Sequence, residues 1–351
     1  MIAHLDIDAF YASVELQRHP QARGRPLVVA GSGPRAVVTT ASYEARAYGI
    51  ESAMPAARAR ALCPHAIFLE PDFATYRTKS RELWEIVRGR FSVVGQVGID
   101  EAYVDVTALA RPLPALRALV AEVSAATGLV LSVGVGPSRL VAKTISSAFK
   151  PAAFVAMGRE QAAAHFAGHP AQTLQGVGPK TAERLAALGL RTIGELQRAP
   201  LALLSDRFGE RQARALHARA SFHDDSPVET ERAAKSRSSE VTFPRDVSET
   251  AALEATIDRL ARELAAGLRS RALRARTIGV KIRLDDWTTA TRARTLDCYV
   301  DDETTIAATA VELFRAYAPP RPVRLLGVRA ASFADEPASS PAGEAQLALP
   351  L

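Results

Sequence analysis

Two short acidic motifs in this chain could hold divalent metal ions. Asp6-Ile7-Asp8 ends a stretch in which apolar and polar residues alternate, and Asp100-Glu101 follows a glycine-containing segment much later in the chain. Hard divalent cations take oxygen ligands, and two such ions about 3.5–4 Å apart can assist an in-line phosphoryl displacement. Aspartate pairs at strand ends are often only turn formers or helix caps, so the spacing alone leaves both interpretations open.

Strands must place these carboxylates. The first eight residues alternate between apolar and polar side chains, which predicts a half-buried strand with its carboxylates at the far end. Residues 93–106 predict two strands around a glycine-containing turn. Because neighbouring residues of a strand point to opposite faces, Asp100 and Glu101 can converge only if the strand end is bent, which Gly95 and Gly98 permit.

Helix and strand patterns alternate through the rest of the first half, with one early pair of adjacent strands. The predicted helices cover 10–16, 42–49, 76–91, 114–127 and 138–150, and the further predicted strands cover 27–31, 36–40 and 129–136. This half of the chain is therefore α/β or α+β.

The second half changes composition three times. Residues 158–228 predict only short helices, and the polar residues 229–239 predict a linker. Residues 240–333 predict the order strand, helix, strand, strand, helix, strand. Ala, Ser, Pro and Glu dominate from Asp335 onward, which is typical of a disordered tail.

Composition excludes several classes of protein. The 351 residues are 48% hydrophobic and carry 44 basic against 38 acidic side chains, so two or more domains and a mildly basic protein are expected. Only 6% aromatic residues disfavours a single-strand binder built on stacking. Cys63 and Cys298 are too few for a disulfide framework, and the seven histidines show no paired-ligand spacing. With neither a signal peptide nor a spanning apolar run, we expect a cytoplasmic protein rather than a secreted protein, membrane protein or zinc hydrolase.

Several segments resemble, in order, the signature blocks of the Y-family translesion DNA polymerases, and most closely the bacterial DNA polymerase IV type. They are HLDIDAFYASVE, TTASYEARAYGI, GIDEAYVDV, SVGVGPSRLVAKTISSAFKP, GVGPKTAERLAALGLRTIGEL and KSRSSEVTFPRDV. Together these blocks extend from residue 1 to about residue 333.

The resemblance implies a multidomain α+β fold shaped as a right-hand polymerase. An α/β palm would comprise residues 1–10 and 72–157, with small fingers at 11–71. An all-helical thumb with a helix-hairpin-helix would follow at 158–228, then the linker 229–239, an α/β little finger at 240–334 and the tail 335–351.

The same resemblance implies roles for individual residues. Asp6, Asp100 and Glu101 match the catalytic metal ligands, with the Ile7 carbonyl as a further ligand, for two Mg²⁺ ions or possible Mn²⁺. Tyr11 matches the steric gate, whose ring would collide with a 2′-hydroxyl. The nucleotide-binding set is completed by Thr40, Tyr43, Arg46 and Lys150.

Two positions depart from the family pattern. Gly98 stands where a serine usually precedes the catalytic pair, and SSAFKP lacks an aspartate often found before the lysine. Neither change removes a metal ligand, so we expect an active enzyme whose geometry, metal preference or rate could differ.

Basic residues in the second half would hold DNA. The backbone of Gly176 and Gly178 could face a phosphate beside Lys180, although such a glycine turn is also common in plain helical hairpins. Residues 232–296 hold 14 basic against 8 acidic side chains. Such a run is often only a solvated face, but it lies where the family grips DNA, with Arg274, Arg276 and Lys281 among the contacts.

The last six residues resemble the peptide with which bacterial polymerases bind a sliding clamp. Gln346 would supply the polar contact, and Leu347, Leu349 and Leu351 the apolar anchors. The alternative is a frayed terminus that has no partner.

Taken together, these patterns predict a low-fidelity, template-directed DNA polymerase for translesion synthesis, which adds deoxynucleoside triphosphates to primer-template DNA, releases pyrophosphate and does not proofread. We expect a monomer. A DNA-binding accessory protein with a dead polymerase fold is a weaker alternative, because the three carboxylates are present. A nucleotidyl cyclase is another, but it would not need the helix-hairpin-helix or the basic C-terminal half.

Overall fold

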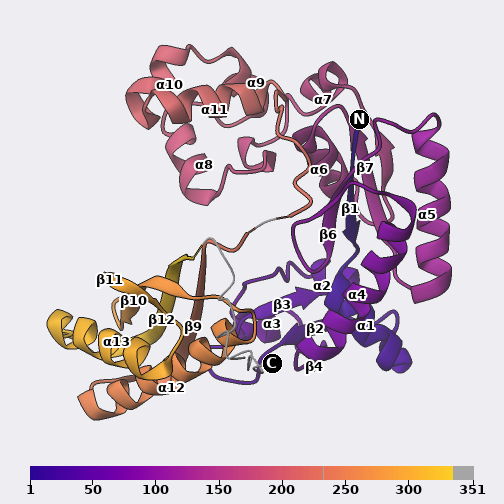
Figure 1. Cartoon of the computed structure of the whole chain (residues 1–351). Helices are drawn as coiled ribbons and strands as arrows, with labels where there is room; N and C mark the ends of the chain where they lie inside the picture. The colour runs from indigo at the N-terminus through magenta and orange to yellow at the C-terminus, as the bar shows by residue number, and fades with distance from the viewer. Residues whose placement is uncertain (232, 335–351) are drawn as a thin grey trace, which may run out of the picture. The chain divides into compact units, whose positions relative to one another are not determined.

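The protein is described from a computed structural model, which covers residues 1–231 and 233–334 (Figure 1). Contacts along the chain divide it into two units. Of the described residues, 1–32 and 36–231 form the first unit, and 33–35 with 233–334 form the second. We describe each unit by itself.

A five-stranded mixed sheet is the centre of the first unit. The strand order is β5 (Val94–Gln96), β6 (Glu101–Asp105), β1 (Ile2–Ile7), β7 (Leu131–Gly136) and β8 (Phe154–Ala156). The central strand β1 is antiparallel to both β6 and β7, while β7 and β8 are parallel. These strands all come from the two segments that the sequence predicts as the palm.

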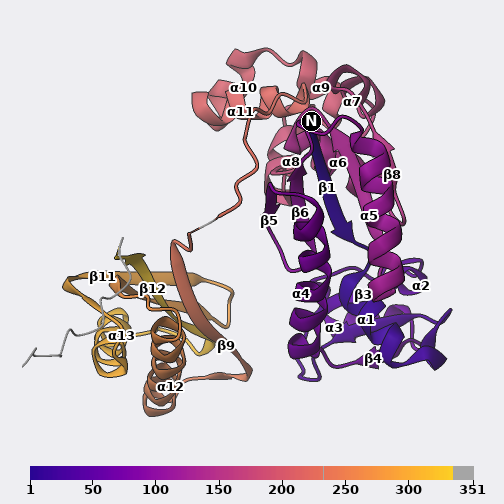
Figure 2. The same cartoon turned by 45° about the vertical axis from the view of Figure 1, so that its right-hand side comes forward.

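Helices cover both faces of this palm sheet. Helices α4 (Phe73–Arg90) and α5 (Pro112–Thr127) pack on the face to which Ala3 and Leu5 point, and Figure 2 shows them along one side of the sheet. Helix α6 (Arg139–Ala148) covers the opposite face. The alternation of β1 therefore sends Ala3, Leu5 and Ile7 to one core and Ile2, His4 and Asp6 towards α6.

The predicted fingers segment forms a smaller sheet with short helices. Its strand order is β3 (Val38–Ala41), β2 (Leu27–Ala30) and β4 (Ile67–Leu69). The helices are α1 (Phe10–Arg18), the 3-10 turn η1 (Pro20–Ala22), α2 (Tyr43–Arg46) and α3 (Ala56–Leu62). The early strand pair predicted at 27–31 and 36–40 is confirmed, because β2 and β3 pair antiparallel.

The predicted thumb segment contains helices only. They are α7 (Arg159–His165), the 3-10 turn η2 (Ala171–Thr173), α8 (Pro179–Ala186), α9 (Ile193–Arg198), α10 (Leu201–Phe208) and α11 (Glu210–Ala220). Their core contains Phe166, Leu185, Leu216 and Phe222.

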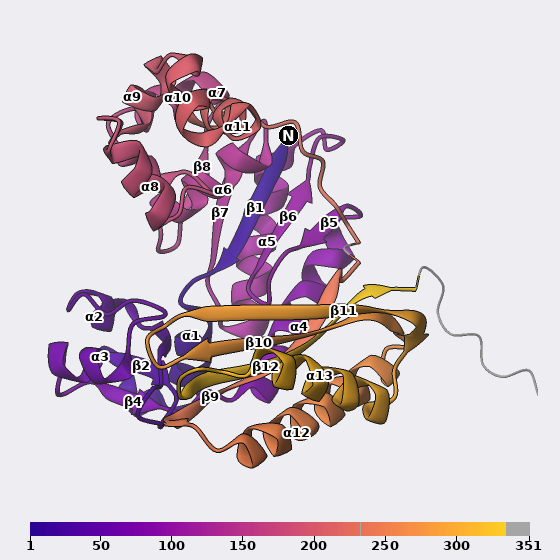
Figure 3. The ribbon, with the colours of Figure 1, turned by 90° about the vertical axis from the view of Figure 1, so that its left-hand side faces the viewer.

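The second unit is a four-stranded antiparallel sheet with two helices packed on one face, as Figure 3 shows. Its strand order is β11 (Thr289–Val300), β10 (Ala275–Leu284), β12 (Val323–Phe333) and β9 (Ser236–Val247). The helices are α12 (Thr250–Arg269) and α13 (Glu303–Tyr317). This order of elements confirms the pattern predicted for residues 240–333.

The predicted C-terminal end of the linker, at residue 239, is wrong. Strand β9 begins at Ser236, so the last four residues of the 229–239 segment belong to the sheet, where Ser236 pairs with Ala331 and Ser239 with Val328. Pairing with a neighbouring strand overrides the low apolar content of this edge segment. The predicted tail 335–351 lies outside the described residues. Among the helices of the described residues, none is long and apolar enough to cross a membrane.

Candidate active site

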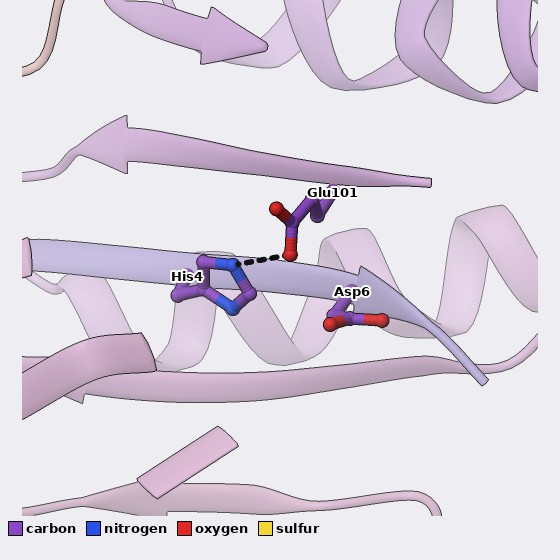
Figure 4. A group of neighbouring side chains, drawn as sticks. All are labelled: His4, Asp6 and Glu101. Atoms are coloured by element: carbon purple, nitrogen blue, oxygen red, sulfur yellow. Dashed lines mark ion pairs between the residues drawn. The ribbon is translucent and has the colours of Figure 1, made fainter. Parts of the chain in front are cut away.

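Three side chains of the palm sheet meet on the face that α6 covers. Asp6 of β1 lies directly opposite Glu101 of β6 in the antiparallel register, and His4 precedes Asp6 by two residues on the same face. One donor atom from each of the three lies within 4.8 Å of the others. Figure 4 shows the His4 ring and the Asp6 and Glu101 carboxylates gathered at this part of the sheet.

Asp100 joins this group because the chain bends before β6. The strand begins at Glu101, so Asp100 lies in the preceding bend and is not bound by strand alternation. The backbone N–H of Ile7 donates to the Asp100 carbonyl at 2.9 Å, which ties the bend to β1. The predicted bend exists and contains Gly98, whereas Gly95 lies inside β5 (Val94–Gln96).

Two side chains of helix α4 donate hydrogen bonds to this bend. The indole N–H of the fully buried Trp84 donates to the Ile99 carbonyl at 3.0 Å, and the Ser80 hydroxyl donates to the same oxygen. Both donors therefore fix the residue immediately before Asp100. Sequence analysis identified the helix but not these two contacts.

Helix α6 lies unusually close to the sheet because Gly134 of β7 has no side chain. A Cβ atom at this position would lie 2.2 Å from the Ala142 carbonyl oxygen and 2.7 Å from the Ser146 nitrogen. The close approach brings the Lys143 ammonium between two carboxylates, at 3.2 Å from Asp6 and in direct contact with Glu101. Lys143 is therefore part of the site, although sequence analysis did not select it.

Lys150 and Asp8 complete the charged cluster. The Lys150 ammonium contacts Asp6 and lies 3.7 Å from Asp8. Asp8 is almost completely buried and accepts hydrogen bonds from the Ser132 hydroxyl at 2.8 Å and the Ala152 N–H at 2.6 Å. Those bonds fasten the end of β1 to β7 and to the segment after Lys150, so Asp8 has a structural role here.

The two neighbouring carboxylates have opposite electrostatic surroundings. Burial, and then the negative charges of Asp6 and Glu101, raise the pKa of Asp100 above its usual range. Contact with the His4 ring and then with the Lys143 ammonium lowers the pKa of Glu101 to about 2, although its burial acts in the opposite direction. Burial lowers the pKa of Lys143, but Asp6 and Glu101 outweigh that effect and raise it overall.

His4 is a part of the site that sequence analysis missed. Its side chain is fully buried, and burial lowers its pKa. Its Nδ1 atom lies 2.8 Å from the Ser146 hydroxyl of α6, and its Nε2 atom lies 3.4 Å from Glu101 Oε2. The available signal was parity, because His4 and Asp6 are two residues apart on one strand and so share a face.

The donor set fits a divalent metal ion. Carboxylate oxygens of Asp6 and Glu101 converge on one position, and the buried Nε2 atom of His4 has no hydrogen-bond partner in the described structure. Asp100 adds a further carboxylate next to Glu101 in the sequence, and its backbone is tied to β1 by the Ile7 N–H. Ile7 has its side chain in the palm core, and the ligand role of its carbonyl remains a prediction.

Of the predicted nucleotide-binding residues, Lys150 lies in the predicted palm segment, and Tyr11, Thr40, Tyr43 and Arg46 lie in the predicted fingers segment. Tyr11 of α1 stacks on Tyr76, with ring centroids 4.5 Å apart. Burial, and then the charge of Asp100, raise the pKa of Tyr11. Tyr43 and Arg46 lie on one side of α2 as predicted, with the guanidinium 4.7 Å from the ring centroid.

The side chain of Thr40 is buried and that of Tyr43 is half-buried. Thr40 is buried on β3, opposite Val29 of β2. The Tyr43 hydroxyl is buried without a hydrogen-bond partner in the described structure, and burial followed by the charge of Asp8 raises its pKa. A buried hydroxyl near carboxylates is well placed to meet a polar ligand group.

The predicted thumb contacts lie on an exposed turn. Gly176 has φ +88°, a left-handed conformation that favours glycine, and Gly178 is the N-cap of α8. Lys180 lies in the first turn of that helix and is exposed. The Arg219 guanidinium lies beside Gly176, so α11 adds a basic group that sequence analysis did not connect with this turn.

The little finger places its predicted DNA contacts around β10. Arg274 and Arg276 are exposed, and the Arg274 guanidinium donates to the Tyr299 carbonyl at 2.5 Å. Lys281 is half-buried and forms an ion pair with Glu240 at 2.9 Å. Lys281 is therefore less available to a phosphate than the two arginines. The clamp residues Gln346, Leu347, Leu349 and Leu351 lie outside the described residues.

Comparison with protein-family models covers most of the chain. The model of the impB/mucB/samB family matches residues 5–147, and the model of that family's C-terminal domain matches residues 234–349. A model described as the thumb domain of DNA polymerase-iota matches residues 172–221.

Curated relatives and a solved structure agree with these matches. DNA polymerase IV of Methanoculleus marisnigri is 39% identical over 94% of this chain and 93% of the relative. DNA polymerase IV of Halorhodospira halophila is 40% identical over 93% of each chain. A solved Y-family DNA polymerase chimera matches the fold with a TM-score of 0.85, at 23% identity, over 94% of this chain and 98% of the other.

The fold and the acidic palm define a nucleotidyltransferase that acts on nucleic acid. The chain belongs to the Y-family DNA polymerases, of the DNA polymerase IV type. It is a DNA-directed DNA polymerase for translesion synthesis that uses template-primer DNA and nucleotides and depends on a divalent metal.

Proposed function

We propose that the chain extends primers by two-metal-ion phosphoryl transfer at Asp6, Asp100 and Glu101. The observation that supports this most is the direct pairing of Asp6 with Glu101 across β1 and β6, with Asp100 brought beside them by a bend that α4 holds. Clustered carboxylates that face one position are the donors that magnesium prefers. We therefore propose Mg²⁺ as the ion, with the Ile7 carbonyl as an additional ligand.

Each residue then has a definite task. The bound ions would lower the pKa of the primer 3′-hydroxyl and neutralise charge on the triphosphate and the departing pyrophosphate. Asp6 and Glu101 hold their positions through the sheet register, and Asp100 through the Ile7 N–H. Before an ion binds, Lys143 contacts both Asp6 and Glu101.

The fingers would select and hold the incoming nucleotide. The Tyr11 ring is fixed against Tyr76 and has Phe73 at its edge, 5.9 Å away, so it has little room to give way to a 2′-hydroxyl. Arg46 can bind phosphate oxygens in a bidentate manner, and Tyr43 and Lys150 would contact the same triphosphate. Thr40, which lies on β3, would contact the same triphosphate.

We propose that the enzyme copies with low fidelity and without proofreading. The helices and strands of the described residues are taken up by the regions assigned to palm, fingers, thumb and little finger. A primer with a mispaired 3′ end tests this proposal, because the terminal nucleotide should stay in place when Mg²⁺ is present and nucleotides are withheld. Shortening of that primer would contradict it.

Primer extension on undamaged and abasic templates tests the proposed function as a whole. We expect extension on both templates with Mg²⁺, extension with Mn²⁺ as well, and pyrophosphate released in step with each addition. Extension that stops completely at the abasic site would contradict the assignment to damage bypass.

We also propose that the chain acts as a monomer and is tethered to a sliding clamp through Gln346, Leu347, Leu349 and Leu351. Deletion of residues 346–351 should leave the turnover of the isolated enzyme unchanged, because no palm or basic residue is lost. Processivity with a clamp should fall, because a tether raises the effective concentration at the primer end. Equal clamp retention of the truncated and full-length chains would contradict the proposal.

A further inference from the structure

The buried ring of His4 presents an unused donor atom to the catalytic carboxylates. The side chain has no exposed surface and lies between β1 and α6. Its Nε2 atom has no hydrogen-bond partner in the described structure and lies 3.4 Å from Glu101 Oε2 (Figure 4). A buried polar atom that lacks a partner is costly, so this arrangement calls for an explanation.

The Ser146 hydroxyl allows either ring nitrogen of His4 to carry the hydrogen. It lies 2.8 Å from Nδ1 of His4 and 3.0 Å from the Lys143 carbonyl oxygen, and a hydroxyl can donate to a ring nitrogen or accept from it. Without a cation, an Nε2–H group can point at Glu101, in line with the lowered pKa of that carboxyl. When Nδ1 instead donates to Ser146, the Nε2 lone pair faces Glu101 and can bind a cation.

Distances in the group suit a shared cation. Two neighbouring ligand atoms of one cation, each about 2.0–2.2 Å from it, lie roughly 3–3.5 Å apart, and Nε2 and Glu101 Oε2 lie 3.4 Å apart. Asp6 supplies the third donor, within 4.8 Å of both. The Lys143 ammonium contacts both Asp6 and Glu101, so a positive charge is stabilised between these two carboxylates.

We propose that His4 donates its Nε2 nitrogen to the cation held by Asp6 and Glu101, so that one ion of this active site is bound by mixed nitrogen and oxygen ligands. The proposal rests on the proposed function only in taking Asp6 and Glu101 as metal ligands. Imidazole favours transition metals over Mg²⁺, so the ratio of Mn²⁺ to Mg²⁺ affinity is higher than in a site made of oxygens alone. The incoming ion displaces the Lys143 ammonium, which is part-exposed and can turn to solvent.

Pulsed electron paramagnetic resonance of bound Mn²⁺ tests this directly. The full-length protein is loaded with Mn²⁺ alone at less than one equivalent. Its echo modulation should contain the nitrogen coupling of a directly bound imidazole. Labelling only the histidines with ¹⁵N should replace the ¹⁴N pattern, which separates His4 from a lysine amine and requires no substitution.

Variants then assign the signal to His4. His4→Gln and His4→Phe should lose the coupling and weaken Mn²⁺ binding about tenfold, with the Mg²⁺ dissociation constant changed less than about twofold because that ion depends on oxygen ligands. The exposed His223, changed to Gln, is the matched control and should keep both the coupling and the Mn²⁺ affinity.

The outcomes separate this proposal from the function it rests on. Absence of histidine nitrogen coupling in the wild-type protein would overturn it and would leave His4 as a group that only orients Glu101. Coupling that persists in a folded His4→Gln variant would also overturn it. Mg²⁺-dependent extension by the wild-type enzyme would stand in either case, because that reaction tests the carboxylates alone.

Discussion

Asp100 and Glu101 are neighbours in the sequence but have different surroundings. Glu101 contacts Lys143 and the His4 ring, whereas Asp100 lies among the negative charges of Asp6 and Glu101. The protein therefore neutralises the charge of Glu101, whereas the buried charge of Asp100 destabilises the fold until a cation binds.

This difference predicts opposite effects on stability at pH 7 in chelator-treated protein. The raised pKa of Asp100 means that stability is lost as pH rises through the window above its ordinary value of 3.8, so Asp100→Asn should raise the free energy of unfolding. The pKa of Glu101, lowered from 4.5 to about 2, gives stability above pH 4.5 that is lost as pH falls towards 2, so Glu101→Gln should lower it. Urea unfolding measures both changes, and shifts of the same sign would contradict the electrostatic account.

Replacing Tyr11 tests the nucleotide-binding face. Tyr11→Ala removes the ring that stacks on Tyr76, so the ratio of ribonucleotide to deoxynucleotide insertion should rise by about 10–100-fold. Single-nucleotide insertion kinetics with both sugars measures the ratio, since selectivity is a difference between two affinities. Tyr11→Phe is the control and should keep the wild-type ratio, because it retains the ring. An unchanged ratio in the alanine variant would mean that another side chain forms the gate.

At the scale of elements, two packing contacts position the site. Gly134 allows α6 to approach β7 closely enough for Lys143 and Ser146 to reach β1 and β6, and α4 fixes the Ile99 carbonyl through Trp84. A strand residue without a side chain is thus as important to the geometry as the charged residues are.

Gly134→Ala should therefore damage both stability and catalysis. The added Cβ would lie 2.2 Å from a backbone oxygen of α6, so the helix must shift, at a cost of about 2–3 kcal/mol. Lys143 would move with it, and metal-dependent extension should weaken at temperatures where the variant is folded. Gly89→Ala in α4 is the matched control, because its Cβ would meet nothing within 4 Å and should be neutral or stabilising. Equal stability of the two variants would contradict the close packing described for α6.

Sequence alone predicted these elements but not the contacts between them. The alternation in the first eight residues predicted strand β1 and the face on which Asp6 lies, and the helix after Ser138 was also predicted. His4 and Lys143 were missed because they meet through the packing of α6 on β7, which depends on Gly134 and is not visible in either segment. The predicted start of strand β9 lies too late in the chain, because pairing with β12 rather than composition determines where the strand begins.

For the whole molecule, the distribution of charge matters more than the net charge of +6. The Asp6 and Glu101 carboxylates converge on the palm sheet, and the second unit carries exposed arginines around β10. Contacts from such arginines to the DNA backbone would position the duplex without reading its sequence.

The salt dependence of duplex binding measures that contribution. If about six phosphates are contacted, the slope of log K against log salt should be roughly −5. Replacing Arg274 and Arg276 together with glutamine should flatten the slope by up to about two units and weaken all sequences alike. Lys281→Gln is the comparison, and its effect should be smaller, because Lys281 is already paired with Glu240. A loss that depends on the DNA sequence would mean that the arginines read bases.

The central claim is that Asp6, Asp100 and Glu101 form the metal site of the polymerase, and one measurement tests it most directly. Single-turnover nucleotide addition should be followed against Mg²⁺ concentration for the wild type, Asp100→Asn and Asp105→Asn, with duplex affinity measured alongside. Asp105 is an exposed aspartate of the same strand β6 and should behave as wild type. We predict that Asp100→Asn loses at least about a hundredfold in rate and keeps its duplex affinity. Wild-type addition and an unchanged Mg²⁺ dependence in Asp100→Asn would contradict the account.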